Sequence, residues 1–227
     1  MTAQDDRRRR LLETIREEFA YTRSFTGEKT PDPRVESALD RVQRDAFVPS
    51  GVVAYAYDNN PLPIGHGQTI SQPYIVALMT DLLGVGAEDT VLEVGTGSGY
   101  QAAILSQLVG RVYTVEIIPE LGAQAAERLQ RLGYDNVSCR IGDGYYGWPE
   151  HAPYDAIIVT AAAPKIPPPL VAQLKPGGRI VLPVERGFGA QELIVVEKTP
   201  DGKIQTRDIL PVSFVPLTGN HDKPDTD

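Results

Sequence analysis

The hydrophobic and polar positions of the chain follow two different patterns, one before residue 90 and one after it. In the first part, apolar residues recur every three or four positions, as in helices that bury one face. Leu11, Leu12, Ile15 and Phe19 form the clearest of these faces. The pattern predicts helices over about 5–20, 34–44 and 72–83, a polar connector over 26–33 and irregular backbone over 47–67.

Short apolar runs alternate with helical patterns from Thr90 onward. Such alternation is typical of right-handed strand–helix–strand units, which build a mostly parallel sheet with helices on both faces. We expect strands at about 90–94, 111–116, 136–141, 154–159 and 178–184, and helices at about 98–109, 119–132 and 167–174. Two more runs, at about 191–197 and 204–210, flank the turn sequence Pro200-Asp201-Gly202 and predict a closing antiparallel pair, which brings the sheet to seven strands.

The length of 227 residues fits one large domain, or one domain with an N-terminal addition. We expect residues 1–83 to form N-terminal helices and a functional loop packed on a core, and residues 84–219 to form that core. The polar segment 220–227 is expected to be a disordered tail.

Composition and charge narrow the class of protein. The net charge of −8 argues against a nucleic-acid-binding surface, and no apolar run approaches the roughly 18 residues of a membrane span. No secretory signal follows the arginine run 7–10, and the single Cys139 leaves no internal disulfide or cysteine-based metal cluster. We therefore expect a cytoplasmic protein without a bound metal ion, and with neither nucleic acid nor membrane as a partner.

The most informative motif is a glycine-rich turn between the first expected parallel strand and its helix. Glu93 is followed by Gly95, Gly97 and Gly99, which gives the order acidic-x-G-x-G-x-G. Glycines allow a sharp turn and a close ligand approach, and the helix start offers free N–H groups. A nicotinamide dinucleotide fingerprint would have its third glycine at Tyr100, so the motif instead resembles that of methyltransferases that use S-adenosyl-L-methionine (SAM).

Acidic residues also follow the next two strands. Glu116, with Ile117 after it, ends the second strand about 20 residues beyond the glycine turn, where a carboxylate binds ribose hydroxyls. Asp143 and Gly144 follow the third strand, where an acid in this architecture commonly reaches the adenine amino group. The plainer interpretations are a solvated strand end for Glu116 and an Asp-Gly turn for Asp143.

The loop after the fourth strand argues against two kinds of methyltransferase. Residues 160–164 are Thr-Ala-Ala-Ala-Pro, without the Asn/Asp-Pro-Pro-aromatic motif of enzymes that methylate amino groups of nucleic acids. Cytosine C5 enzymes need a cysteine in this loop, and Cys139 lies elsewhere. Because no residues for a difficult deprotonation are visible, we expect an acceptor that is already nucleophilic at neutral pH, such as a carboxylate.

A further motif, Pro63-Ile64-Gly65-His66-Gly67-Gln68-Thr69-Ile70-Ser71-Gln72-Pro73, resembles the active-site loop of the protein-L-isoaspartate O-methyltransferase family. The resemblance continues at Asp143-Gly144, 153–162, 174–179 and 214–218, and it extends over roughly 34–218. It implies an α/β fold of the Rossmann-like SAM-dependent methyltransferase type. Such a fold has a mostly parallel seven-stranded sheet, an antiparallel C-terminal pair and, here, extra N-terminal helices.

The resemblance also implies an activity and a set of site residues. The family transfers a methyl group from SAM to the α-carboxylate of L-isoaspartyl residues in damaged proteins and peptides, and the ester returns through a succinimide to aspartate. S-adenosyl-L-homocysteine (SAH) is the other product, and we expect the enzyme to be a monomer. The implied catalytic residue is Ser71. The implied cofactor-binding residues are Ile64, Gly65, His66, Gly67, Gln72, Glu93, Gly95, Gly97, Gly99, Glu116, Ile117, Asp143, Gly144 and Thr218. The implied substrate-binding residues are Thr69, Ile70, Ser71, Val215, Pro216 and Leu217.

Other interpretations stay open on the sequence alone. Ser71 is also a candidate N-cap for the helix over 72–83. A methyltransferase of a small carboxylate acceptor would keep the glycine turn but would not need the Ser71 loop. A nicotinamide-dependent oxidoreductase would bind NAD, and a SAM sensor would bind SAM without turnover. The sequence does not define the preferred peptide context or the fate of D-aspartyl sites.

Overall fold

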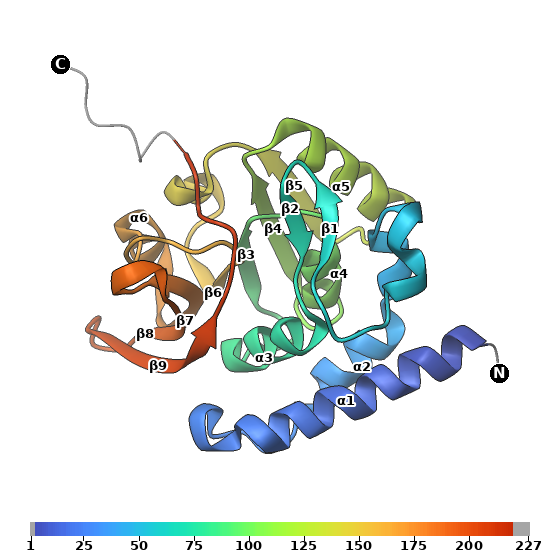
Figure 1. Ribbon diagram of the computed structural model, residues 1–227. Coiled ribbons are helices and arrows are strands. Elements are labelled where there is room, and N and C mark those ends of the chain that lie inside the picture. The colour runs from blue at the N-terminus through green and yellow to red at the C-terminus, as the bar shows by residue number, and fades with distance from the viewer. Residues whose placement is uncertain (1–2, 220–227) are drawn as a thin grey trace.

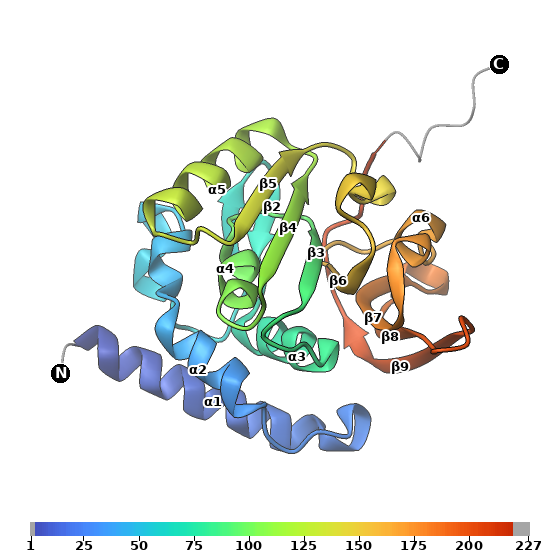
Figure 2. The same cartoon turned by 180° about the vertical axis from the view of Figure 1, so that it is seen from behind.

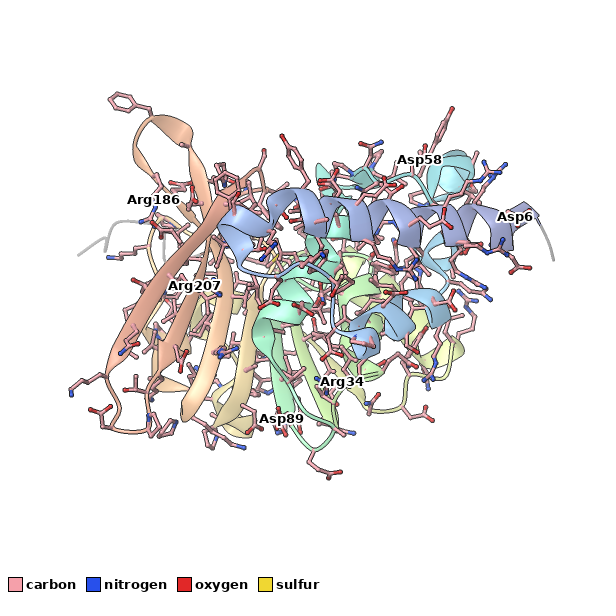
Figure 3. All side chains as sticks on the ribbon, turned by 90° about the horizontal axis from the view of Figure 1, so that it is seen from below. Asp6, Arg34, Asp58, Asp89, Arg186 and Arg207 are labelled. Carbon is pink, nitrogen blue, oxygen red and sulfur yellow. The ribbon has the colours of Figure 1, made fainter. Side chains whose placement is uncertain are left out.

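The computed structural model describes residues 3–219, so the expected tail at 220–227 lies outside the described part of the chain. The chain begins with helix α1 (Ala3–Thr26), which runs beneath the rest of the molecule (Figure 1). The apolar face predicted for this helix is buried, but the helix continues six residues past the expected end at 20. Figure 3 shows Arg207 beside the end of α1, and its guanidinium donates a hydrogen bond to the Thr26 carbonyl at 3.1 Å.

Helix α2 (Pro33–Arg41) starts at a proline, and the Asp32 carboxylate caps it by accepting the Arg34 N–H at 2.7 Å. The prediction that this helix reaches residue 44 is wrong. The chain leaves the helix at Val42, whose side chain is buried and whose backbone is extended. Residues Arg44–Phe47 then form a 3-10 turn.

The segment expected to be irregular, 47–67, contains regular structure. A 3-10 turn over Ser50–Tyr55 is followed by a short antiparallel hairpin of β1 (Leu62–Gly65) and β2 (Gln68–Ile70). Its turn, Gly65-His66-Gly67, has positive φ at all three residues (94°, 52° and 71°), which explains the two glycines. Helix α3 (Pro73–Leu83) follows with Gln72 as its N-cap, so the N-cap interpretation of Ser71 is wrong.

The predicted seven-stranded sheet is confirmed, with the order β5-β4-β3-β6-β7-β8-β9. The first five strands in this order are parallel, and β8 and β9 are the predicted antiparallel pair. Figures 1 and 2 show the sheet from its two sides. The strand bounds are β3 (Thr90–Val94), β4 (Arg111–Glu116), β5 (Val137–Ile141), β6 (Tyr154–Val159), β7 (Leu174–Glu185), β8 (Gln191–Lys198) and β9 (Ile204–Val212).

Helices cover both faces of the sheet, as expected. Helices α3, α4 (Tyr100–Ser106) and α5 (Pro119–Arg131) pack on one face, and α1 and α2 close the same side of the core. Helix α6 (Pro168–Ala172) packs on the other face with Leu170 in a second apolar cluster. Helices α4 and α6 are shorter than predicted. Residues 174–177 belong instead to β7, which starts four residues before the expected strand.

Strands β3, β4, β6 and β7 contribute side chains to both apolar clusters. Val91 packs with the helices of one face, and Leu92 packs with the cluster on the other. This two-sided burial holds the carboxyl ends of the parallel strands in one plane, from which the loops of the site project. None of the helices in the described part of the chain is long and apolar enough to cross a membrane.

Candidate active site

A cavity opens at the carboxyl ends of the parallel strands, the edge at which open parallel sheets bind ligands. Most of its wall comes from segments that are far apart in the sequence. The wall residues are 68–71, Val76, 93–98, Tyr100, Gln101, 115–118, Gly144, Thr160, Ala161 and 215–218.

The glycine turn forms the cavity wall at the end of β3. Gly95, Gly97 and Gly99 all have positive φ, at 95°, 54° and 86°, so each uses a conformation that side chains rarely adopt. The Gly95 N–H donates to the Val115 carbonyl at 2.9 Å, which ties the turn to the neighbouring strand. A Cβ at Gly95 would lie 2.4 Å from the Thr160 hydroxyl oxygen, so the turn also needs glycine there for space.

Glu116 holds the glycine turn through its carboxylate. Its Oε2 accepts the Gly97 N–H at 2.7 Å, and its Oε1 accepts the Ile118 N–H at 2.9 Å. The side chain is buried at the cavity wall. A carboxylate has about four acceptor positions, so Glu116 retains capacity for ribose hydroxyls after these two bonds.

Glu93 is a buried carboxyl group without a hydrogen-bond partner among the described residues. The Thr114 hydroxyl on the neighbouring strand pairs with the Thr96 hydroxyl at 2.6 Å. Burial, and next to it the nearby Glu116 carboxylate, raise the pKa of Glu93 to about 8. Leaving such a group unpaired is costly, and SAM brings positive charge at its ammonium and sulfonium groups. Glu93 therefore fits a cationic ligand in this cavity.

Asp143 and Gly144 lie where the third parallel strand ends. The Asp143 carboxylate accepts the Tyr145 N–H at 3.0 Å and so caps a short 3-10 turn. Gly144 is part of the cavity wall, whereas Asp143 is half-buried beside it. A Cβ at Gly144 would lie 2.4 Å from a methyl group of Val94, so glycine keeps this turn tight against β3.

Ser71 lies where the cavity meets a second hollow. This hollow is here called the acceptor groove. Thr69, Ser71, Thr160 and Val215 border both spaces. The acceptor groove is lined by Pro61, Thr69, Ser71, Gln72, Ile75, Thr160, Pro211, Val212, Ser213, Phe214 and Val215.

The segment after β9 separates the two spaces on their other side. Ala162 joins this segment to the loop after β6, because its N–H donates to the Val215 carbonyl and its carbonyl accepts the Leu217 N–H, at 2.8 and 2.7 Å. The Gln191 side chain makes two bonds to Phe214, with its amide N donating to the carbonyl at 3.0 Å and its oxygen accepting the N–H at 2.6 Å.

The structure brings most of the predicted site residues to these walls. Those on the cavity wall are Thr69, Ile70, Ser71, Glu93, Gly95, Gly97, Glu116, Ile117, Gly144, Val215, Pro216, Leu217 and Thr218. Gly65, His66 and Gly67 form the exposed turn of the hairpin, outside the wall. Ile64 packs beside Gly97, Gln72 borders only the acceptor groove, and Gly99 packs against α5. The individual roles of all these residues stay predictions.

Sequence reasoning missed several residues of the two walls. Thr96 and Ser98 fell within the strand-end segment 93–99 that the sequence indicated as a whole, but neither was given a role of its own. Gln101, on the first turn of α4, carries no local signal for a site. Thr160 was named only as part of a strand-end loop, although it borders both spaces. Within residues 3–219, no group of three or more acidic, histidine or cysteine side chains could hold a metal ion.

Known proteins resemble this chain over nearly its whole length. The family model described as Protein-L-isoaspartate(D-aspartate) O-methyltransferase (PCMT) matches residues 24–222. Protein-L-isoaspartate O-methyltransferase 2 of Syntrophobacter fumaroxidans is 61% identical over 214 residues, which cover 94% of this chain and 87% of that protein. Protein-L-isoaspartate O-methyltransferase 2 of a Polaromonas species is 61% identical over 209 residues, which cover 92% of this chain and 99% of that protein.

A solved structure gives the same result in three dimensions. It is a PCMT-type protein from Plasmodium falciparum in complex with SAH, and it matches with a TM-score of 0.76 at 25% identity. The match covers 92% of this chain and 99% of that one. The family model, the close relatives and the shared fold lead to one conclusion: the chain belongs to the protein-L-isoaspartate(D-aspartate) O-methyltransferase family.

Proposed function

We propose that this enzyme transfers a methyl group from SAM to the free α-carboxylate of L-isoaspartyl residues in proteins and peptides. Its family membership supports both the reaction and the substrate class. The single observation that carries the assignment in the structure is that the cavity lined by the glycine turn and an open groove meet at Ser71. A methyl group bound on one side would then face an acceptor on the other.

The cofactor half of the site supports SAM binding through two carboxyl groups. Glu116 keeps acceptor positions for ribose hydroxyls, and Glu93 offers an unpartnered carboxyl to a cation. Gly97 and Gly144 leave backbone without side chains at the wall, which allows close approach. When bound, SAM supplies an electrophilic methyl group on a sulfonium.

The acceptor groove supports a peptide substrate rather than a compact one. It runs from Ser71 along Pro211 to Val215, where the chain leaves the edge strand β9. An extended peptide can pair with backbone at such an edge, while its side chains enter neighbouring hollows. We place the isoaspartyl residue near Thr69, Ile70 and Ser71, and the chain that flanks it along 215–217.

The acceptor needs little chemical activation. A carboxylate is ionised at neutral pH, so one of its oxygens can form the bond to the methyl carbon while the bond from that carbon to sulfur breaks. Neither wall contains a His or Lys among the described residues, so Ser71 is not assigned as a nucleophile. Its hydroxyl instead donates a hydrogen bond to the second carboxylate oxygen. Positioning and exclusion of water then supply most of the rate enhancement.

The test uses methyl-labelled SAM and two peptides that differ only in L-isoaspartate or L-aspartate at one position. We expect base-labile label on the isoaspartyl peptide alone. Ser71→Ala should lower turnover by about tenfold or more and leave the SAH dissociation constant unchanged, because the serine acts on the acceptor side. Ser138→Ala, on the distant strand β5, is the matched control and should behave as wild type.

Each other outcome has a definite meaning. Full activity of Ser71→Ala would remove the role given to that residue but leave the reaction in place. Label on neither peptide, with SAH still bound in calorimetry, would contradict the proposed acceptor. A methyltransferase of a small carboxylate would then be the better assignment, and a panel of small carboxylic acids would test it.

A further inference from the structure

Arg44 is the largest fully buried side chain in the described part of the chain, with 0% of its surface exposed. It lies in the 3-10 turn Arg44–Phe47, behind the walls of the site and outside every motif that sequence reasoning singled out. Arginine stays protonated in proteins, so the turn places a positive charge in the interior.

The guanidinium of Arg44 contacts both halves of the site. Its Nη2 donates to the Ser71 carbonyl at 2.8 Å and approaches the Asn60 carbonyl at 3.4 Å. Its Cζ lies 4.9 Å from the centre of the Tyr100 ring, and Tyr100 is a wall residue of the cofactor cavity. Among residues 3–219, Nε and Nη1 have no hydrogen-bond partner of regular geometry, and no carboxylate forms an ion pair with Arg44.

A buried guanidinium with two unpaired nitrogen atoms and no counter-ion is destabilising by itself. An apolar residue of similar volume would pack the same space without that cost. Burial therefore does not explain the arginine, whereas its strongest contact, the bond to Ser71, gives a reason for it.

The bond to the Ser71 carbonyl fixes one particular peptide. The Ser71–Gln72 peptide is trans, so its N–H points away from the carbonyl and hence away from Arg44. Ser71 and Gln72 both border the acceptor groove, and Pro73 begins α3 immediately after them. Holding this carbonyl therefore sets the orientation of the residue whose hydroxyl is proposed to contact the acceptor carboxylate.

We propose that Arg44 is a positioning residue for the methyl acceptor, which holds the Ser71–Gln72 peptide so that the Ser71 hydroxyl faces the isoaspartyl carboxylate. The inference rests on the proposed function of Ser71. In this proposal the buried charge of Arg44 fixes the backbone of the loop that carries Ser71. The planar guanidinium is suited to this task, because it can lie over the Tyr100 ring and donate to Ser71 at the same time.

The test compares Arg44→Lys and Arg44→Met with wild type, using methyl transfer to the isoaspartyl peptide and SAH calorimetry. We expect kcat/KM for the peptide to fall about 10- to 100-fold, mostly in kcat, because a misplaced group loses transition-state contacts. The SAH dissociation constant should change by less than about threefold, because the cofactor walls stay in place. In a Ser71→Ala background, Arg44→Lys should have no further effect on kcat.

Phe47→Leu is the matched control for a purely structural role. Phe47 is fully buried in the same 3-10 turn, and its ring centre lies 5.5 Å from that of Tyr100. It should lower the melting temperature without the loss of kcat. Equal losses of kcat in Phe47→Leu and Arg44→Lys would overturn the proposal. It would also be overturned if Arg44→Lys lowered kcat by the same factor in the Ser71→Ala background as in wild type.

A second measurement separates this inference from the proposed function. We expect Arg44→Lys to shift the Gln72 amide resonance, observed by NMR, whether or not the peptide is a substrate. If wild type methylates no isoaspartyl peptide but the resonance moves, the acceptor assignment fails and the positioning contact stands. If wild type is active and Arg44→Lys matches it in kcat/KM, the inference fails and the function stands. If Arg44→Met does not fold, Arg44→Lys still tests the inference. In wild type, the guanidinium resonances of Arg44 should also shift when the isoaspartyl peptide is added, and unchanged resonances would contradict the inference.

Discussion

The two halves of the site are built in different ways. The longest continuous part of the cofactor half is the segment 93–101, and its glycine turn is held by hydrogen bonds to the Val115 carbonyl and to the Glu116 carboxylate. The acceptor half is assembled from the loop around Ser71, the loop at Thr160 and the segment after β9. Side chains from elsewhere, Arg44 and Gln191, hold its backbone in place.

This difference indicates which residues control cofactor binding and which control peptide binding. The glycine turn is tied to the neighbouring strand β4 without any ligand, so we expect the cofactor half to be preformed and to respond mainly to changes in these few residues. An acceptor half held by single side chains should respond to changes far from the groove. Variants should therefore separate cofactor affinity from peptide kinetics, and four predictions test that separation.

The largest effect should come from Glu116→Ala. It removes the acceptor for the Gly97 and Ile118 N–H groups and the proposed ribose ligand at once. We expect the SAH dissociation constant to rise about 100-fold, since each hydrogen bond to a charged group contributes about 1.5–3 kcal/mol. Calorimetry measures it, with Glu120→Ala, exposed at the start of α5, as the control. Unchanged SAH affinity in Glu116→Ala would contradict the role of Glu116 in the cofactor half.

Glu93→Gln should change how the stability of the cofactor half depends on pH. The pKa of Glu93 is raised from 4.5 to about 8 on folding, so the proton is held more tightly in the folded state. Its contribution to stability is full below about pH 4.5 and is lost as pH rises through 8. Wild type without ligand should therefore lose up to about 1.4 kcal/mol per pH unit relative to Glu93→Gln in this window. Chemical unfolding at pH 5, 6.5 and 8 tests it, and parallel curves for the two proteins would contradict it.

Gln191→Ala should affect the acceptor half alone. It releases both the N–H and the carbonyl of Phe214, so the segment that borders the groove loses two anchors. The loss of about 1–2 kcal/mol should appear as a five- to thirtyfold rise in the peptide KM, with SAH affinity unchanged. Gln205→Ala, exposed on β9, serves as the control. A matching loss of SAH affinity would show that the two halves are not separable.

The smallest effect should come from Arg140→Ala. Its guanidinium forms an ion pair with Glu150 at 3.2 Å, and both side chains are more than a third exposed. Such pairs contribute about 0–1 kcal/mol, because solvent screens them. We expect a melting temperature within a few degrees of wild type and unchanged kinetics with both ligands. A clear kinetic change would reveal coupling from the surface into the site.

The same contrast explains which parts of the molecule the sequence could predict. Glu93, the three glycines and Glu116 were recognisable because one turn and one strand end bring them together locally. The sheet was predictable because apolar strands alternate with helical patterns. The hairpin over 62–70 was missed because Pro61, Pro63 and its glycines resemble a loop, although Leu62 and Ile64 alternate with exposed residues.

Contacts between residues that are far apart in the sequence could not be predicted from local patterns. Arg44 was expected as the last residue of the helix over 34–44, and only the tertiary structure shows it buried against Ser71 and Tyr100. The Gln191 side chain forms a hydrogen bond to Phe214, 23 positions further along the chain, and no local sequence pattern predicts that contact. The acceptor loop was recognised by its resemblance to a family, and the residues that support it were not.

The close approach of Gly95 and Thr160 has a consequence for how this enzyme can diverge. The Thr160 hydroxyl donates to the Gly95 carbonyl at 2.7 Å and occupies the space that a Cβ at position 95 would need. An alanine at position 95 therefore needs a smaller residue at position 160, and it must also adopt a φ near 95°, which a residue with a Cβ rarely does. Replacing the threonine would in turn remove a hydrogen bond between the loops after β3 and β6, so a change at position 95 constrains a position 65 residues further along the chain.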